Sequence, residues 1–342
     1  MTMRNFAKII KVFIFLLVGV SCSNKLDDSK DYMCFDDVVY VSEFPEKVML
    51  KADTSYINET IAINDFEILD SLIIYETRES SGGWVICSLN DGRKLKSILD
   101  VGHSKTEFNT IPQLCDGTTF FYDDSDLKSV IYDFGNGQVF EVNITKTLQD
   151  DSLNMSQINN KIQPNLDKYI QMGNNEYFIR DVMTKKSIWY KDGEKCESCV
   201  LDALNDFNLG GDFNVLAAMI RYNKAKDVFV ELPAYTNYIN IFSLSNNNSK
   251  TVCIGNSLQK ISETNIMMGE NYFDLRLFDD YFAILYVKNE SSKPSIQFFD
   301  YEGNPIKEML LDSNATSFDI DTINNILYTF DCEEERFYLY KI

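Results

Sequence analysis

The sequence predicts an all-β protein: a six-bladed β-propeller with four-stranded antiparallel blades and a last blade closed by an N-terminal strand. Three observations lead to this fold. A unit of strands and tight turns recurs six times along the chain. The 342 residues include 24 Phe and 19 Tyr, residue types that strands prefer. The sixth unit is one strand short, and the N-terminal region has an apolar segment to spare.

The unit is clearest in the closing residues 294–342. Ser295–Tyr301 is β-branched and aromatic and ends at Glu302-Gly303-Asn304-Pro305, residues that supply the positive-φ and fixed-φ positions of a hairpin turn. Four more strands are expected after this turn, at Ile306–Leu311, Ala315–Asp321, Ile326–Phe330 and Phe337–Ile342.

The third strand of each unit is the easiest to follow. We expect it at Trp84–Cys87, Val130–Asp133, Ile188–Tyr190, Ile239–Phe242, Ile296–Asp300 and Phe337–Tyr340. Flanking strands are expected at Ser71–Thr77, Lys94–Val101, Thr118–Asp123, Gln138–Ile144, Glu176–Val182, Asp227–Leu232, Thr251–Ile254 and Tyr281–Val287. The spacing of roughly 40 to 60 residues is that of propeller blades, and a closed ring leaves no long open edges.

Closure of the ring requires an outer strand for the sixth unit. Val48–Lys51 follows a turn-like Phe44-Pro45-Glu46 segment, so we expect it to pair beside Phe337–Ile342. The alternative architectures are an open stack of sheets or two β-sandwiches.

The first 21 residues read as a lipoprotein signal peptide. Arg4, Lys8 and Lys11 form a basic region, and Ile9–Val20 is apolar but short for a membrane span. Gly19-Val20-Ser21-Cys22 resembles the lipobox of bacterial lipoproteins, which implies lipid attachment at Cys22. An ordinary cleaved secretion signal is the alternative. Residues 22–34 are expected to form a flexible tether, and residues 35–342 the propeller.

The charge and composition of the chain limit the kinds of partner and the cellular location that we expect. The formal charge is −20, and loss of the three signal-peptide cations would make it more negative still. We therefore expect no nucleic-acid binding and membrane association through lipid alone. The early Asp27 and Asp28 resemble the acidic surface-export signals of Bacteroidetes lipoproteins. The expected location is the outer membrane, surface-exposed or otherwise periplasmic.

A loop after the first unit resembles a known family. Val101–Phe108 is similar to the Gly-x-Gly-Pro-x-Glu-Phe motif of the TolB-like six-bladed propeller lipoproteins of Bacteroidetes: Gly102, Glu107 and Phe108 are kept, and Ser104 and Lys105 depart from it. The closing residues also look like the last two blades of that family. The resemblance implies a fold and a place in the cell envelope, and it brings no catalytic residue.

Candidate site residues are few. His103 is the sole histidine, so any histidine-dependent triad or metal site must use it. Lys105 and Glu107 would lie beside it in a loop that could face a ligand. Cys196 and Cys199 form a single CxxC, which could be a local disulfide or two free thiols; a zinc site would need a second pair. We expect no metal and no cofactor.

Two functions remain open. The first is a lipid-anchored, monomeric binding module that presents one face to a protein, peptide or glycan. The second is a glycoside hydrolase or lyase with paired carboxylates. Long loops are where binding residues gather, and two apparent insertions between blades, Lys146–Asn165 and Asn256–Asn271, are expected on the face that carries His103. A complete repeat without a complete catalytic constellation favours the binding module.

Overall fold

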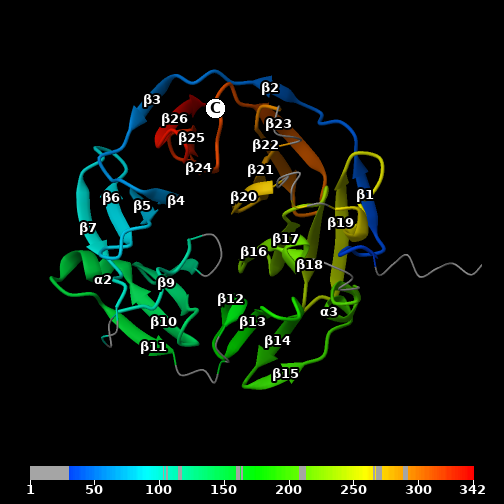
Figure 1. Cartoon of the computed structure of the whole chain (residues 1–342), viewed down its shortest axis with the longest axis horizontal. Coiled ribbons are helices and arrows are strands. Elements are labelled where there is room, and N and C mark those ends of the chain that lie inside the picture. The colour runs from blue at the N-terminus through cyan, green and yellow to red at the C-terminus, as the bar shows by residue number, and fades with distance from the viewer. Residues whose placement is uncertain are drawn as a thin grey trace, which may run out of the picture.

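The computed structural model confirms the six-bladed β-propeller. It describes residues 31–102, 104, 107–114, 118–158, 162, 165–207, 213–264, 266, 272–287 and 292–342. Six sheets stand around a central axis like the blades of a turbine (Figure 1). Within each blade the first strand lies nearest the axis.

The first three blades follow the chain without interruption. Their strands are, for blade 1, β4 (Ile63–Leu69), β5 (Leu72–Thr77), β6 (Trp84–Ser88) and β7 (Lys94–Ile98); for blade 2, β8 (Thr118–Asp123), β9 (Asp126–Asp133), β10 (Gln138–Asn143) and β11 (Met155–Ile158); and for blade 3, β12 (Leu166–Gly173), β13 (Glu176–Asp181), β14 (Ser187–Lys191) and β15 (Glu194–Cys196).

The other three blades each receive a strand from the N-terminal region. Their own strands are, for blade 4, β16 (Ala218–Asn223), β17 (Val228–Pro233), β18 (Tyr238–Ser243) and β19 (Asn248–Ile254); for blade 5, β20 (Tyr272–Leu277), β21 (Tyr281–Tyr286), β22 (Ser295–Asp300) and β23 (Pro305–Leu310); and for blade 6, β24 (Ser317–Asp321), β25 (Ile326–Asp331) and β26 (Arg336–Lys341). The helical segments with bounds in the described residues are α2 (Ile144–Gln149), α3 (Cys199–Leu204), η2 (Phe213–Leu216) and η3 (Ile261–Glu263).

An N-terminal strand does close the last blade, but it is not the expected one. β3 (Thr54–Ile57) runs antiparallel to β26, with Tyr56 opposite Phe337. The expected segment, Val48–Lys51, overlaps β2 (Lys47–Met49), which pairs in parallel with β23 of blade 5 instead. β1 (Val38–Val41) adds in the same way to β19 of blade 4. The N-terminal region thus passes along the outer edges of blades 4, 5 and 6 in turn (Figure 1).

The expected strand order in blade 2 was also wrong by one strand. Val130–Asp133 lies in β9, the second strand, and the expected insertion Lys146–Asn165 contains the outer strand β11. A tight turn between β8 and β9, with Asp124 at φ 55°, had already made one hairpin. Because successive hairpin turns carry the same residue types, the turn after β9 resembled the one that follows a third strand.

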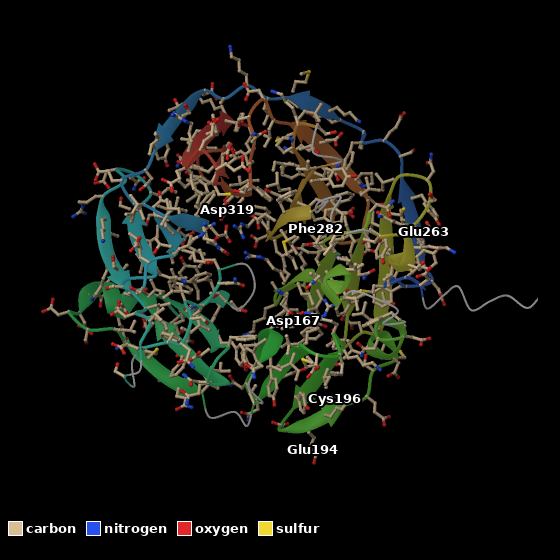
Figure 2. All side chains as sticks on the ribbon, in the orientation of Figure 1. Asp167, Glu194, Cys196, Glu263, Phe282 and Asp319 are labelled. Carbon is tan, nitrogen blue, oxygen red and sulfur yellow. The ribbon has the colours of Figure 1, made fainter. Side chains whose placement is uncertain are left out.

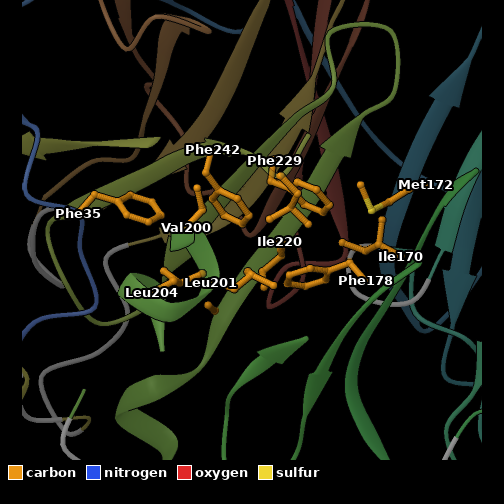
Figure 3. Close-up of a cluster of buried hydrophobic side chains, with 12 residues drawn as sticks. Phe35, Ile170, Met172, Phe178, Val200, Leu201, Leu204, Ile220, Phe229 and Phe242 are labelled. Atoms are coloured by element: carbon orange, nitrogen blue, oxygen red, sulfur yellow. The ribbon is translucent and has the colours of Figure 1, made fainter. Parts of the chain in front are cut away.

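Aromatic side chains fill the spaces between blades. Between blades 3 and 4, Phe178, Phe229 and Phe242 pack with Val200 and Leu201 of α3 (Figure 3). The rings of Phe229 and Phe242 stack with centroids 5.0 Å apart. Such a pair contributes about 0.5–1.5 kcal/mol beyond its buried area. Similar clusters at the other interfaces hold the blades in a fixed ring, so the residues on the inner strands have fixed positions.

Candidate functional site

Charged side chains meet at the axis of the ring. Asp319 lies close to it, among the nitrogen and oxygen atoms at the centre of the molecule (Figure 2). The inner strands β4 and β20 each contain a bulge near their start, and a bulge re-aims the side chains beside it. The members of this axial cluster are Asp65 and Glu67 of β4, Arg221 of β16, Asp274 and Arg276 of β20, and Asp319 of β24.

Arg276 connects three blades. Its Nη2 lies 3.0 Å from Asp65 Oδ1 in blade 1 and 3.0 Å from Asp274 Oδ2 in its own blade. Its Nε donates to the Phe318 carbonyl of blade 6 at 2.8 Å. Nη1 has no hydrogen-bond partner among the described residues, and the Glu67 carboxylate is 3.7 Å away. One guanidinium nitrogen of a side chain that is only 2% exposed is therefore left without a hydrogen bond.

A second arginine spans the ring. Arg221 of blade 4 and Glu67 of blade 1 come from opposite sides of the six-membered ring. Their pair is bidentate, with Nη1–Oε1 and Nη2–Oε2 distances of 3.1 Å each. Such a planar, two-bond pairing is geometrically specific as well as strong. It crosses the axis and so forms the floor of any cavity that enters from one end.

Two carboxylates fasten neighbouring blades. Asp274 accepts the backbone N–H of Leu275 at 2.7 Å and that of Phe318 in blade 6 at 3.0 Å. Asp319 accepts N–H groups of Ile320 at 2.8 Å and of Ile68 in blade 1 at 2.7 Å. Both are almost wholly buried, so they hold the inner strands of adjacent blades in register.

Burial and the nearby arginines shift the pKa values of these carboxyl groups in opposite directions. Burial raises the pKa of Asp274 to about 8 and the pKa of Asp319 to about 7, against the pull of Arg276. Burial likewise raises the pKa of Asp65. Burial alone would also raise the pKa of Glu67, but Arg221 and Arg276 outweigh it and hold that pKa below its ordinary value. The cluster has four carboxyl groups for two guanidinium groups, and burial raises the pKa of three of the four: Asp65, Asp274 and Asp319.

A cavity of about 910 Å³ opens from this cluster. Its floor includes Glu67, Arg221, Arg276 and Asp319; its walls include Phe120, Tyr222, Tyr281, Phe298 and Lys307; and its rim includes Asp70, Asp279, Asp280, Asp321 and Ile323. The rim residues lie in the turns that join first strands to second strands. The cavity therefore opens at the end of the ring opposite to the loops that connect successive blades.

A groove continues the cavity outward between blades 2 and 3. It has a volume of about 480 Å³ and shares Phe120, Tyr222, Phe278 and other residues with the cavity. Its outer part is lined by Phe121, Val130, Ile158, Gln171, Asn174, Asn175 and Lys224. Lys224 Nζ lies 5.9 Å from the ring centroid of Phe121. The two hollows form one continuous depression that changes from charged at the axis to amide-rich and aromatic outside.

One of the ligand-binding residues expected from the sequence, Glu107, can be placed, and it lies outside the cavity. Glu107 belongs to the loop from blade 1 to blade 2, where its Oε2 accepts the N–H of Ser104 at 2.7 Å, and it does not line the cavity. A Cβ at Gly102 would meet the Glu107 carboxylate at 2.1 Å, which explains why glycine and glutamate occur together in this loop. His103, Lys105 and Cys22 lie outside the described residues.

Both thiols of the CxxC motif are free in the structure. Cys196 Sγ lies 3.9 Å from the Glu194 carbonyl, and Cys199 Sγ lies 3.6 Å from Asn247 Oδ1. The disulfide between them stays a prediction. In the described part of the chain, no three His, Cys, Asp or Glu side chains are placed to hold a metal ion. None of the helices in these residues is long and apolar enough to span a membrane.

The axial cluster was not among the residues selected from the sequence. Its signal was present: Glu67 and Arg276 each interrupt an apolar run, in Phe66-Glu67-Ile68 and Leu275-Arg276-Leu277. Charged residues are almost never buried unless they are paired. The partners across the ring, Arg221 for Glu67 and Asp65 for Arg276, come from strands more than 150 positions away in the sequence, so only the fold could reveal these two pairs.

Six blades, four of them four-stranded and two five-stranded, surround a charged axial cavity and define the chain as a six-bladed β-propeller with a candidate site at one end of its axis. No protein-family model and no curated protein matches it. Among solved structures, a putative exported protein of Bacteroides fragilis is similar, at 9% identity and a TM-score of 0.48 over 86% of this chain and 98% of that one.

Two further propellers are similar to the same degree. One is the β-propeller domain of Cps50 (Swd1) from Myceliophteria thermophila, at 9% identity and a TM-score of 0.43 over 86% of this chain and 99% of that one. The other is the set of WD40 repeats of RRP9, at 9% identity and a TM-score of 0.46 over 85% and 99%. The fold assignment rests on the sheet topology of this chain itself.

Proposed function

We propose that this protein is a lipid-anchored propeller of the cell envelope that acts as a binding module and takes its ligand at the axial cavity. The observation that carries the proposal is the cavity itself. It is closed at the bottom by the Arg221–Glu67 pair, walled by aromatic rings, and large enough at about 910 Å³ for a small-molecule-sized ligand. A rigid ring with a few convergent polar groups at its centre is suited to recognition.

The envelope location is supported by the sequence. A basic region, an apolar stretch and Cys22 occur in the order that a lipoprotein signal requires. The resemblance to the TolB-like propeller lipoproteins of Bacteroidetes points the same way. The partners we propose are the outer membrane, through the lipid, and one protein, peptide or glycan ligand at the cavity. We propose a monomer.

Ligand binding tests the proposal. Tyr281 stands in the cavity wall, with its ring centroid 4.7 Å from that of Phe278. Tyr281→Ala should weaken binding about tenfold or more, since an aromatic contact in a desolvated site is worth ~2 kcal/mol. Met183→Ala is the control, because Met183 is 70% exposed in the turn between β13 and β14, at the other end of the ring. Equal affinities for both variants would place the site elsewhere.

A glycoside hydrolase or lyase is the second candidate. Glu67 and Asp319 both line the cavity and have pKa values shifted in opposite directions, as an acid and base pair would. Both are nevertheless held by hydrogen bonds on each oxygen, which favours binding over catalysis. Release of reducing ends from a polysaccharide panel, abolished by both Glu67→Gln and Asp319→Asn, would establish the enzyme instead.

A further inference from the structure

We infer that the cavity and the adjoining groove together bind a saccharide of several linked units, with one unit at the axial cluster and the next ones in the groove. The inference rests on the proposed function and adds the chemical class of the ligand. Three features of the described residues carry it: the mixture of donors and acceptors at the floor, the aromatic walls, and the continuity of the two hollows.

The floor suits a hydroxyl group better than a charged group. Arg221 and Glu67 both line the floor of the cavity, where 15% and 13% of their side chains remain exposed. Asp319 lines the same floor. A ligand carboxylate would meet these two acidic side chains, and a ligand ammonium would meet Arg276 and Arg221. A hydroxyl can accept from the guanidinium and donate to a carboxylate at once.

The walls supply flat apolar surfaces beside the polar floor. Phe278 and Tyr281 are both partly exposed, and their rings stack with centroids 4.7 Å apart and planes at 26°. Lys307 Nζ lies 4.8 Å from the centroid of Phe298. Phe278 of blade 5 and Phe120 of blade 2 each line both the cavity and the groove. Aromatic rings give large contact area at small entropic cost, and sugar rings present C–H faces that match them.

The groove extends the site beyond one ring. The cavity of about 910 Å³ is already at the upper end of the ~300–1,000 Å³ that holds a drug-sized ligand, and the groove adds about 480 Å³. Asn174 and Asn175 are exposed at the turn between β12 and β13, beside Lys224. Amide groups both donate and accept hydrogen bonds, so a chain with hydroxyls at each unit can continue outward.

The test uses lipid-free mature protein on an array of glycans and an array of peptides. The saccharide class that binds is then measured by calorimetry as a hexasaccharide and as its monosaccharide. We expect the hexasaccharide to bind at least tenfold more tightly. Asn174→Ala with Lys224→Ala should weaken the hexasaccharide about tenfold and leave the monosaccharide unchanged. Tyr281→Ala should weaken both, and Met183→Ala neither.

Several results would overturn the inference. Equal affinities for the monosaccharide and hexasaccharide would remove the role of the groove. If no glycan on the array bound, the ligand would not be a saccharide and the inference would fail. If peptides bound instead, in a manner that depends on Tyr281, the proposed function as a binding module would still hold. Glycan binding that Tyr281→Ala leaves intact would contradict the cavity as the site of both the inference and the proposed function.

Discussion

Arg276 is the residue on which the centre of the ring depends most. It pairs with Asp65 and Asp274 and donates hydrogen bonds to the carbonyl groups of Phe318 in blade 6 and Phe66 in blade 1. Removal of one partner from a buried ionic network leaves uncompensated charge, which costs about 3–5 kcal/mol. Arg276→Met, which keeps much of the side-chain length, should therefore lower the free energy of unfolding by about that amount in urea titration.

The control for this substitution is Arg93→Met. Arg93 is 73% exposed and lies 3.7 Å from Asp91 on the surface, and exposed pairs of this kind contribute about 0–1 kcal/mol. If both variants lost the same small amount of stability, the axial cluster would not be a structural requirement of the ring.

The raised pKa values of Asp274 and Asp319 predict a dependence of stability on pH. Both groups bind a proton more tightly in the folded chain than in the unfolded chain, where an Asp pKa is about 3.9. Their stabilisation is complete below pH of about 4 and is lost as the pH rises through about 7 and about 8. The pKa of Glu67 is lowered, so its contribution to stability has the opposite pH dependence. That contribution is lost only as the pH falls into the acid range.

We therefore expect the free energy of unfolding to fall between pH 5 and pH 9. Asp274→Asn imitates the protonated carboxyl group, so the variant should lose less stability than the natural chain over the same interval. Urea unfolding at both pH values measures the difference. Two results would contradict the raised pKa of Asp274. One is a natural chain that is more stable at pH 9 than at pH 5, and the other is a variant that loses as much stability as the natural chain over this interval.

At the residue scale, the sequence showed which strands carry charged residues but not that these residues are buried and paired. The alternation of apolar and charged residues in Phe318-Asp319-Ile320-Asp321 predicted a strand with two faces. In the structure Asp319 and Asp321 are both buried: the first ties blades together, and the second caps a turn through the N–H groups of Ile323 and Asn324. A strand at a propeller axis has no solvated face, so alternation there does not mean exposure.

At the scale of elements, β3 is the strand that closes the ring. Tyr56 of β3 stacks on Phe337 of β26, with centroids 5.3 Å apart and planes at 12°. Tyr56→Ala should cost about 2–3 kcal/mol, less than a fully buried aromatic residue would. Met49→Ala on β2, where the side chain is 84% exposed, should change stability by less than ~0.5 kcal/mol.

Thermal and urea unfolding of the two variants measure the contribution of each N-terminal strand. If the Met49 variant lost more stability than the Tyr56 variant, β2 and not β3 would be the N-terminal strand that closes the ring. Equal, small losses would mean that blade 6 holds its outer strand by backbone pairing alone.

The choice between these two strands could not be made from the sequence. Val48–Lys51 was the more apolar segment, whereas Thr54–Ile57 begins with two hydroxyl residues. An outer strand is half exposed, and β3 has three of its four residues exposed. Apolar character therefore identifies central strands well and edge strands poorly, which is also why β11 was mistaken for part of an insertion.

At the scale of the whole molecule, the N-terminal segment and the cavity lie at opposite ends of the ring. Asp31 accepts hydrogen bonds from Ser262 in the loop between blades 4 and 5. Met33 is buried with Leu216, just before the first strand of blade 4, and its N–H donates to Tyr238 Oη at 3.0 Å. These are the ends of strands where blades connect, while the cavity opens at the other ends.

This placement predicts how the protein stands on a membrane if Cys22 carries the proposed lipid. Residues 23–30 reach at most about 30 Å when fully extended, and a blade is roughly 20–25 Å tall. To turn the cavity toward the membrane, these residues would have to run stretched along a blade, at about 1–2 kcal/mol for each residue fixed. The favoured arrangement has the cavity facing away from the membrane, toward ligands from the surrounding medium.

Energy transfer from a single fluorescent label to dye-labelled lipid headgroups tests this orientation. Met183 and Ile323 are a matched pair, at 70% and 71% exposure, in turns at the blade-connecting end and the cavity end respectively. Each is replaced by Cys in a background with Cys34→Ser, Cys115→Ser, Cys196→Ser, Cys199→Ser and Cys332→Ser, which keeps the buried Cys87 and Cys253, and the lipidated protein is placed in vesicles. The label at 183 should transfer energy more efficiently, because it lies nearer the bilayer by about the height of a blade. Equal or reversed efficiencies would show that the cavity does not face outward, whereas protein that fails to float with the vesicles would contradict the lipid anchor itself.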